Sequence, residues 1–231
     1  MTRIDLPNYV EPIFIGVRVA LMILVAVAGL AMLSKATTTR RTLMGVASVL
    51  VLWCICVWAL LRFGGYQPIF LPLLILVPVG TAALFARTKA GKRFIDAVPQ
   101  QGLIGIQIFR VVGGSFLFLW TDGLMPGLFA LPVGIGDILV GVFALVLAIL
   151  IVRGNYPHLA IVGWNLFGLA DHIMALSLGI TTSPGPFQQF SIEQPNVLTV
   201  TYPVAIIPAF IIPLSFILHG LSLWKLRRVR S

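Results

Sequence analysis

The chain has 231 residues, of which 59% are hydrophobic and 10% are charged, and its mean hydropathy is +1.04. A soluble domain carries about 25% charged residues and could not bury this much apolar surface, so a soluble fold is excluded. The net charge of +9 fits either a nucleic-acid partner or anionic lipid headgroups. Because the basic residues lie in short loops between apolar runs, we expect the lipid bilayer as the partner and no nucleic acid.

Seven apolar runs approach or exceed the roughly 20 residues that a helix needs to cross the hydrocarbon layer. They cover residues 13–34, 42–63, 68–86, 101–120, 130–152, 158–180 and 201–224. Backbone polar groups must be paired inside lipid, and the runs lack the period-two alternation of barrel strands. The sequence therefore predicts an all-α integral membrane protein, with one polytopic transmembrane domain over residues 1–231. The mixed residues ahead of the first run do not resemble a cleaved signal peptide.

The positions of lysine and arginine predict the orientation of the chain, because loops on the cytoplasmic side are enriched in them. Basic residues gather after the first, third, fifth and seventh runs, and the opposite loops hold few of them. We therefore expect the N-terminus outside and the C-terminus in the cytoplasm. The expected location is a cell membrane, and the bacterial cytoplasmic membrane (a cell inner membrane) in particular.

The first and last parts of the chain share a weak internal similarity. The third and seventh runs are both rich in proline, and the first and fifth both open with proline followed four residues later by glycine. The pattern is compatible with a three-plus-one-plus-three arrangement of parallel repeats. Transporters of the SWEET type have such repeats, although the chain shows none of that family's motifs. The prolines of the seventh run also predict a kinked or locally unwound helix.

Four ionisable residues inside the apolar runs are the best clue to function, because charge within a membrane is costly. They are Arg110, Asp137, Asp171 and His172. At a rise of about 1.5 Å per residue, Asp137 and His172 should lie about 10–12 Å from the outer ends of their helices, with Arg110 near the midplane. An arginine side chain can reach that height, so we predict a polar ligand-binding or ion-binding site in the outer half of the bilayer. Asp171 points about 100° away from His172 and could face another neighbour.

Small residues share the helix faces of these polar groups. In the fourth run Gln107, Arg110 and Gly114 follow helical spacing, and in the fifth run Asp137 and Gly141 do so. Small residues let membrane helices approach closely, so these faces should point into the bundle. They would also permit a homo-oligomer.

Asn165 and His219 form a second predicted polar level, nearer the inner side of the membrane. The helical rise places His219 about 13 Å from His172 in height. This level could be a gate or part of a pathway, or His219 could be a structural residue.

Titratable groups at mid-depth, kinked helices and the long outer connection at residues 181–200 favour a transporter or channel for a small solute or ion. Proton coupling would use the two aspartates, and His172 would tune or relay the proton. In a purely structural alternative, Arg110 neutralises one aspartate and locks the helices together.

Two other classes of function remain open. A membrane redox protein could bind haem or a metal through His172 or His219, although the predicted height difference disfavours a bis-histidine haem. A ligand-sensing or lipid-modifying membrane protein is a further alternative. The chain shows no nucleophile elbow or phosphate loop, so enzyme activity is not predicted. The sequence assigns no cofactor and no metal site.

Overall fold

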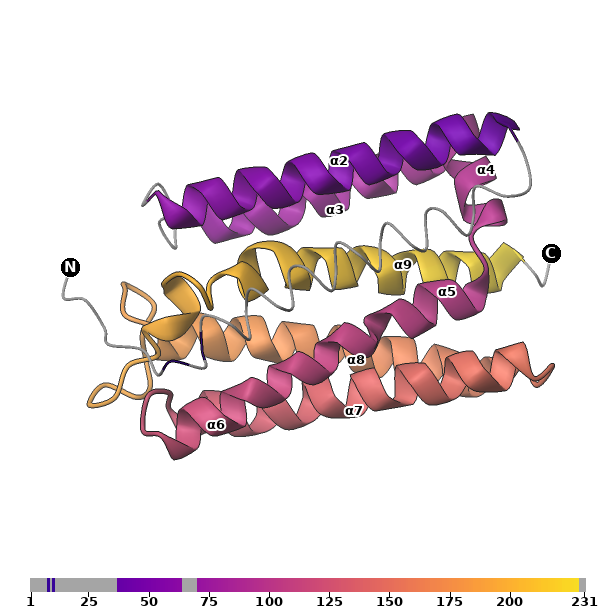
Figure 1. Ribbon diagram of the computed structural model, residues 1–231. Helices are drawn as coiled ribbons and strands as arrows, with labels where there is room; N and C mark the ends of the chain where they lie inside the picture. Colours follow the sequence, from indigo (N-terminus) through magenta and orange to yellow (C-terminus); the bar gives the residue numbers. More distant parts are fainter. Residues whose placement is uncertain (1–7, 9, 11–36, 64–69, 229–231) are drawn as a thin grey trace.

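The computed structural model describes residues 37–63 and 70–228, together with Asn8 and Val10. Over these residues all regular elements are helical and no strand occurs (Figure 1). The predicted all-helical class is confirmed for the described residues, and their long apolar helices are consistent with a multi-pass membrane protein. The first predicted span, at 13–34, falls outside the described residues. The total of seven spans, the orientation and the repeat therefore stay predictions.

Five helical segments of the described chain are long and apolar enough to cross a membrane. They are α2 (Thr37–Arg62), a continuous segment of three helices (Gln100–Thr121), α7 (Gly127–Val152), α8 (His158–Thr182) and a final segment (Ile207–Arg228). The continuous segment consists of α5 (Gln100–Gly105), the 3₁₀ helix η2 (Ile106–Gly114) and α6 (Ser115–Thr121). A sixth candidate is α3 (Leu71–Arg87), which bends by 93° into the short α4 (Lys89–Ala97).

The start of the last predicted span is wrong. Residues 201–205 form turns, and the helix begins with a π-helical segment, η4 (Ile207–Ile211), which continues as α9 (Ile212–Arg228). Pro203 and Pro208 explain this start, since a proline cannot donate its backbone nitrogen to the preceding turn and is tolerated best where a helix begins. A short 3₁₀ helix, η3 (Leu198–Val200), precedes the turns.

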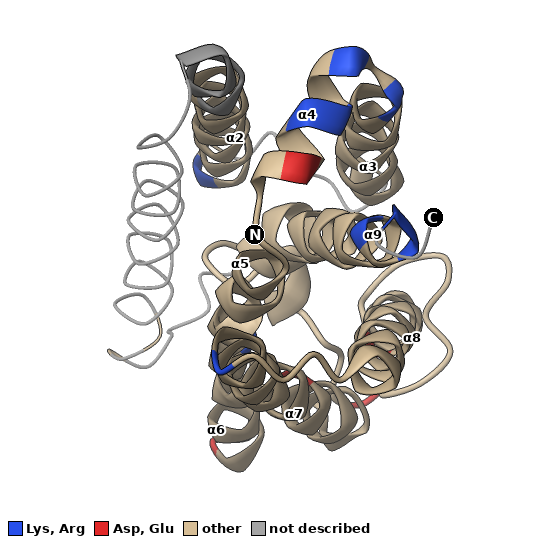
Figure 2. Ribbon diagram, turned by 90° about the vertical axis from the view of Figure 1, so that its right-hand side faces the viewer, with Lys and Arg blue, Asp and Glu red and all other residues tan. Residues whose placement is uncertain are grey.

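The helix α7 packs along the α5–η2–α6 segment on one side and along α8 on the other. In the middle of the bundle, α9 contacts α3, α5 and α8 (Figures 1 and 2). The apolar side chains of α2 are largely exposed, for example Val49 and Leu52, as expected for a helix that faces lipid. Helices α7, α8 and α9 therefore form the wall within which buried polar side chains can meet.

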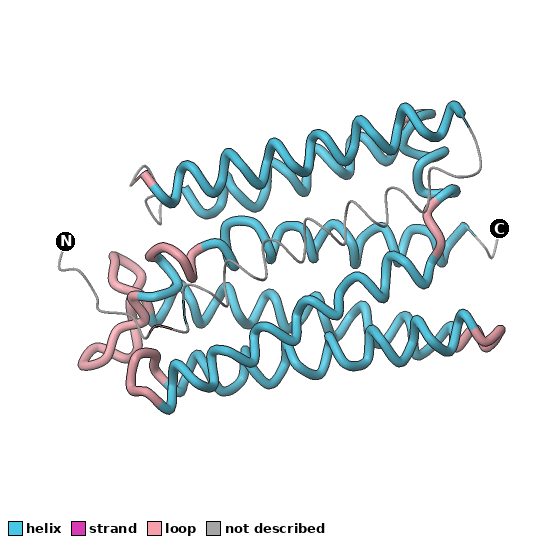
Figure 3. The backbone as a smooth tube through the Cα atoms, in the orientation of Figure 1, coloured by secondary structure: helices cyan, strands magenta, loops and turns pink. Residues whose placement is uncertain are grey.

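The two ends of the bundle differ in chemistry. The loop end carries the turn between α6 and α7 and the long connection from Ser183 to Thr201 (Figure 3). The basic end carries α4, the turn after α7 and the end of α9, where Lys and Arg residues gather (Figure 2). The exposed basic residues at this end are Arg87, Lys89, Lys92, Arg93, Arg153, Arg227 and Arg228. Lys225 ties α9 to α4 by donating from Nζ to the Ile95 carbonyl at 2.8 Å.

Candidate functional site

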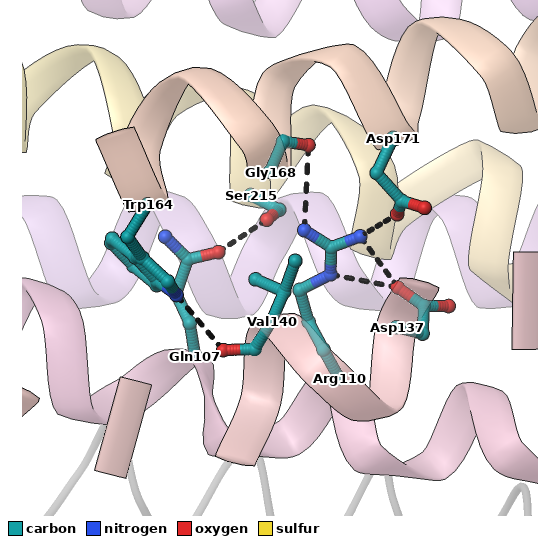
Figure 4. A network of polar contacts seen from close by, with 8 residues as sticks. All are labelled: Gln107, Arg110, Asp137, Val140, Trp164, Gly168, Asp171 and Ser215. Atoms are coloured by element: carbon teal, nitrogen blue, oxygen red, sulfur yellow. Dashed lines mark hydrogen bonds and ion pairs between the residues drawn. The ribbon is translucent and has the colours of Figure 1, made fainter. Parts of the chain in front are cut away.

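The guanidinium of Arg110 lies between two helices and binds a carboxylate on each of them (Figure 4). On the side of α7, its Nε donates to Oδ1 of Asp137 at 2.7 Å, and its Nη2 lies 2.6 Å from the same oxygen. On the side of α8, Nη2 also binds Oδ2 of Asp171, and Nη1 donates to the Gly168 carbonyl at 3.4 Å. The planar fork of an arginine can serve several acceptors at once, so one side chain joins η2, α7 and α8.

The 3₁₀ geometry of η2 decides which residues lie on the same face of the helix as Arg110. With three residues per turn, the positions i, i+3 and i+6 lie in one line, and Gln107, Arg110 and Gly113 are the buried residues of η2. The sequence-based face, which paired Arg110 with Gly114, assumed α-helical spacing and was wrong in this detail. Gly113 is the glycine that faces Asp137.

Glycines let the charged side chains approach the neighbouring backbones closely. A Cβ atom at Gly113 would overlap the Asp137 carboxylate, and one at Gly136 would overlap Oδ1 of Asp171. At Gly168 it would overlap Nε2 of His219 and lie 3.2 Å from Nη1 of Arg110. On η2, α7 and α8, a glycine therefore lets a polar side chain from a neighbouring helix lie directly against the backbone. The charged side chains are closely packed as a result.

The predicted site residues are all buried, and three of the four charged or titratable ones are in direct contact. Arg110, Asp137 and Asp171 are 2%, 9% and 4% exposed, and we call these three residues the ion cluster. Asp171 is a member of the ion cluster. The sequence had not decided this, because Asp171 points about 100° away from His172 around the helix. The ion cluster holds two carboxylates and one guanidinium, so it lacks one positive charge when both carboxylates are ionised.

His172 lies beside the ion cluster without a hydrogen bond to it. Its ring packs against Phe216, with centroids 5.2 Å apart, and against His219 at 6.1 Å. Among the described residues, neither Nε2 of His172 nor Nε2 of His219 has a hydrogen-bond partner. Both imidazoles therefore keep one unused ring nitrogen in the bundle interior.

The predicted height difference between His172 and His219 was wrong, since their rings are in contact. The helices extend further than their apolar runs, with α8 ending at Thr182 and α9 at Arg228. Both histidines consequently lie deeper in the bundle than the runs indicated, on facing sides of α8 and α9. The two predicted polar levels thus adjoin each other.

The second polar level continues from His219 toward the basic end. Asn165 donates from Nδ2 to the Ile161 carbonyl at 2.8 Å and to Oγ of Ser222 at 2.9 Å. Both amide protons are used, so Oδ1 of Asn165 is the acceptor at 3.0 Å for an Nδ1–H group of His219. Gln100 donates to the same Ser222 hydroxyl at 2.6 Å. We call His219, Asn165, Ser222 and Gln100 the polar row.

Replacing Asn165 with leucine should destabilise the protein by about 1–3 kcal/mol, because the buried Nδ1–H of His219 loses its acceptor. Unfolding in mixed detergent micelles measures this change, with Leu166→Ala as a control at a neighbouring exposed position. The ¹⁵N NMR spectrum of the unmodified protein should show His219 with its proton on Nδ1. A proton on Nε2 would contradict the hydrogen-bond assignment.

A pocket of about 610 Å³ lies next to the ion cluster, on the side of the loop end. Its wall comes from α3, α6, α7, α8, η4, α9 and the loop residues that follow α8, and most of it is apolar. The polar residues among those that line it are Asp137, His172, Ser183 and Thr199. Leu76, Ile180 and Phe187 line the pocket and are also exposed, so the pocket reaches the surface of the bundle. We call this cavity the Asp137 pocket.

Two polar residues of the interior, Gln100 and Trp164, were missed by sequence reasoning. Gln107 accepts a hydrogen bond from Ser215 of α9, and Trp164 donates to the Val140 carbonyl at 2.9 Å (Figure 4). Gln100 and Ser222 complete the polar row. The uncharged polar groups of Gln100 and Trp164 were the available signal, but such groups carry less weight than charges because they are common in membrane helices.

Metal chemistry gains no support from the described part of the chain. No group of three or more His, Cys, Asp or Glu side chains is arranged there to hold a metal ion. His172 and His219, the residues considered for haem or metal, instead pack ring against ring.

Comparison with known proteins identifies the family. Residues 68–227, more than half of the chain, match the model of a family described as a domain of unknown function, DUF8737, and the chain belongs to this family. No curated protein and no solved structure matches the chain. The matched region contains the ion cluster and the polar row.

Proposed function

We propose that this member of the family is a membrane transporter that binds a small, largely apolar molecule in the Asp137 pocket and couples its movement to a proton. The observation that carries the proposal is a cavity whose charged lining residue, Asp137, belongs to a buried ion cluster. Pockets of about 300–1,000 Å³ with apolar walls and a few polar groups are typical sites for small molecules.

The route of entry is supported by the exposed residues of the pocket wall. Leu76 on α3, Ile180 on α8 and Phe187 in the following loop connect the cavity with the lipid-facing surface. A solute dissolved in the bilayer could enter there without crossing a charged surface. With the loop end outside, as the basic residues predict, the entrance would face the outer half of the membrane.

Proton coupling is supported by the charge of the ion cluster. Two carboxylates share one guanidinium in a buried place, where an uncompensated charge is costly, so a proton or another cation must balance the second carboxylate. The polar row leads from His219 toward the basic end and offers hydrogen-bonding groups along the way. Buried chains of this kind occur in proton-coupled membrane proteins.

Uptake into proteoliposomes tests the proposal. A panel of small lipophilic molecules is offered under an imposed pH gradient, and accumulated solute is measured by mass spectrometry. Ile180→Trp should reduce uptake because the larger side chain fills the pocket entrance. Ile173→Trp is the matched control, since Ile173 is exposed on the same helix and does not line the pocket.

The outcomes separate the parts of the proposal. Uptake by the unmodified protein no faster than by empty liposomes would reject transport of the panel. Unchanged uptake in Ile180→Trp would reject the pocket as the route. Asp137→Asn should remove the dependence of uptake on the pH gradient, and a retained dependence would reject the role of Asp137 in coupling.

A further inference from the structure

The charge of the ion cluster constrains what can bind beside it. An ordinary imidazole is mostly neutral at about pH 7.5, so His172 and His219 do not supply the positive charge that the ion cluster lacks. With both aspartates ionised, the cluster carries one net negative charge in a buried place. That charge is balanced either by a proton on one carboxylate or by a cation from outside the chain.

Asp137 is the member of the ion cluster that a bound molecule can reach. Its side chain is 13% exposed, compared with 2% for Asp171 and 1% for Arg110. It lines the Asp137 pocket, and neither Asp171 nor Arg110 is among the described residues that do so. The missing positive charge can therefore be supplied from the pocket, at the Asp137 carboxylate.

The pocket wall suits an apolar group attached to that charge. Phe129, Val133 and Asp137 follow one another at intervals of four residues on one face of α7. The Phe129 ring packs edge-on against Phe116, with centroids 5.4 Å apart, and both rings line the pocket. Aromatic rings attract cations through their electron-rich faces and also pack against hydrocarbon.

We infer that the molecule bound in the Asp137 pocket is a lipophilic organic cation, such as a tertiary amine in its protonated form or a quaternary ammonium ion. The inference rests on the proposed function and specifies its substrate class. The positive group contacts the Asp137 carboxylate, and the hydrocarbon part lies against Phe116, Phe129 and the apolar residues of α3 and η4.

Binding of such a cation releases a proton. Before binding, one proton is held by the Asp137–Asp171 pair and leaves the ion cluster neutral. As the cation enters, the carboxyl O–H bond breaks, the proton leaves to water, and the carboxylate pairs with the cation. The charge of the buried cluster is balanced before and after, so cation and proton compete for the same place. An exchange of one for the other follows directly.

The pH dependence of binding involves several groups around Asp137. Arg110 faces it from η2, and Asp171 and His172 face it from α8, with His219 of α9 behind them. The segments α5 and α6, which also pack on α7, contribute no ionisable side chain. Lower pH should weaken cation binding, because protons compete with the cation for the carboxylates.

Equilibrium dialysis with a matched pair of probes tests the inference. The probes are benzyltrimethylammonium and neopentylbenzene, its neutral carbon isostere, and protein-free micelles correct for partition into detergent. The quaternary ion has no titratable proton, so any pH dependence comes from the protein. At about pH 8 the cation should bind about tenfold more tightly than the isostere, as expected for a partly buried charge contact with aromatic neighbours.

Asp137→Asn supplies the decisive variant. It leaves Arg110 paired with Asp171 in a neutral cluster, so folding should survive, and the neutral isostere should still bind. The preference for the cation and most of its pH dependence should disappear. Calorimetry in buffers of different ionisation enthalpy should detect about one proton released per cation by the unmodified protein and none by the variant.

Each other outcome overturns the inference. Equal or tighter binding of the neutral isostere by the unmodified protein rejects a cationic ligand. A cation preference that persists in Asp137→Asn rejects this carboxylate as the counter-charge. If neutral molecules are taken up in the liposome panel while cations are not, the substrate class is wrong and the transport function stands. If the unmodified protein neither binds the probes nor takes up any solute, both proposals fail.

Discussion

Replacement of Arg110 by methionine should lower the free energy of unfolding by about 3–5 kcal/mol, because it leaves two carboxylates in the bundle interior without a positive partner. Arg110 is 2% exposed and contacts Asp137, Asp171 and the Gly168 carbonyl. Methionine keeps much of the apolar length of the side chain and removes the charge. Reversible unfolding in mixed micelles measures the loss.

Arg110→Lys should recover only a small part of the lost stability. The arginine serves acceptors on two helices through Nε, Nη1 and Nη2 at once. A lysine ammonium is a compact point charge on a flexible stem and cannot reproduce that planar fork. Stability equal to that of the unmodified protein in Arg110→Lys would show that the charge alone matters and that the geometry of the guanidinium does not.

A charge-free triple variant separates a structural lock from a functional site. Arg110→Met combined with Asp137→Asn and Asp171→Asn leaves no buried charge, and replacing buried ion pairs by uncharged groups is often nearly neutral in stability. We expect most of the stability to return while proton-coupled uptake stays lost. Full uptake by the triple variant would mean that the ion cluster only holds the helices together.

Gly168→Ala should destabilise the protein by about 1–3 kcal/mol, because the added methyl group overpacks the interior. The added methyl group would overlap Nε2 of His219 and approach Nη1 of Arg110, so both side chains would have to move. The ring of His219 is completely buried and packs against Trp164 and His172, which leaves it no free space. The ion cluster and the polar row should both be disturbed.

Gly163→Ala provides the control on the same helix, five residues earlier. A Cβ at Gly163 meets nothing within 4 Å, so the gain in helix propensity of up to about 1 kcal/mol should leave the protein unchanged or slightly more stable. Unfolding measurements on both variants separate the effect of the contact with His219 and Arg110 from the effect of helix propensity. Equal effects of the two substitutions would contradict the close approach of His219 to α8.

The sequence predicted the helical membrane class correctly, because a long apolar run has few alternatives in lipid. Boundaries were less accurate. The run of α7 was placed at 130–152 and the helix begins at Gly127, so Asp137 lies about 15 Å along the axis from its first residue instead of about 10 Å. Hydropathy marks where the apolar residues are, whereas the helix begins directly after Pro126, its N-cap residue.

The composition of the candidate site could be predicted, but its geometry could not. Arg110, Asp137, Asp171 and His172 stand out as polar groups in apolar runs. Their pairing depends on the 3₁₀ winding of η2, which rotates Gly113 toward Asp137 in place of Gly114. A switch from α to 3₁₀ winding changes which residues share a face, and the spacing of the polar residues along the chain does not record it.

The sequence by itself determined that the chain lies in a membrane as helices and that a few costly polar groups lie within it. Both follow from the free energy of transferring residues into lipid, which is a property of each residue type. Only the tertiary structure decided that Asp171 joins the ion cluster, that His219 touches His172, and that Asp137 alone of the three charged residues faces a pocket. These facts depend on the relative rotation and depth of α7, α8 and α9, which packing between the helices sets.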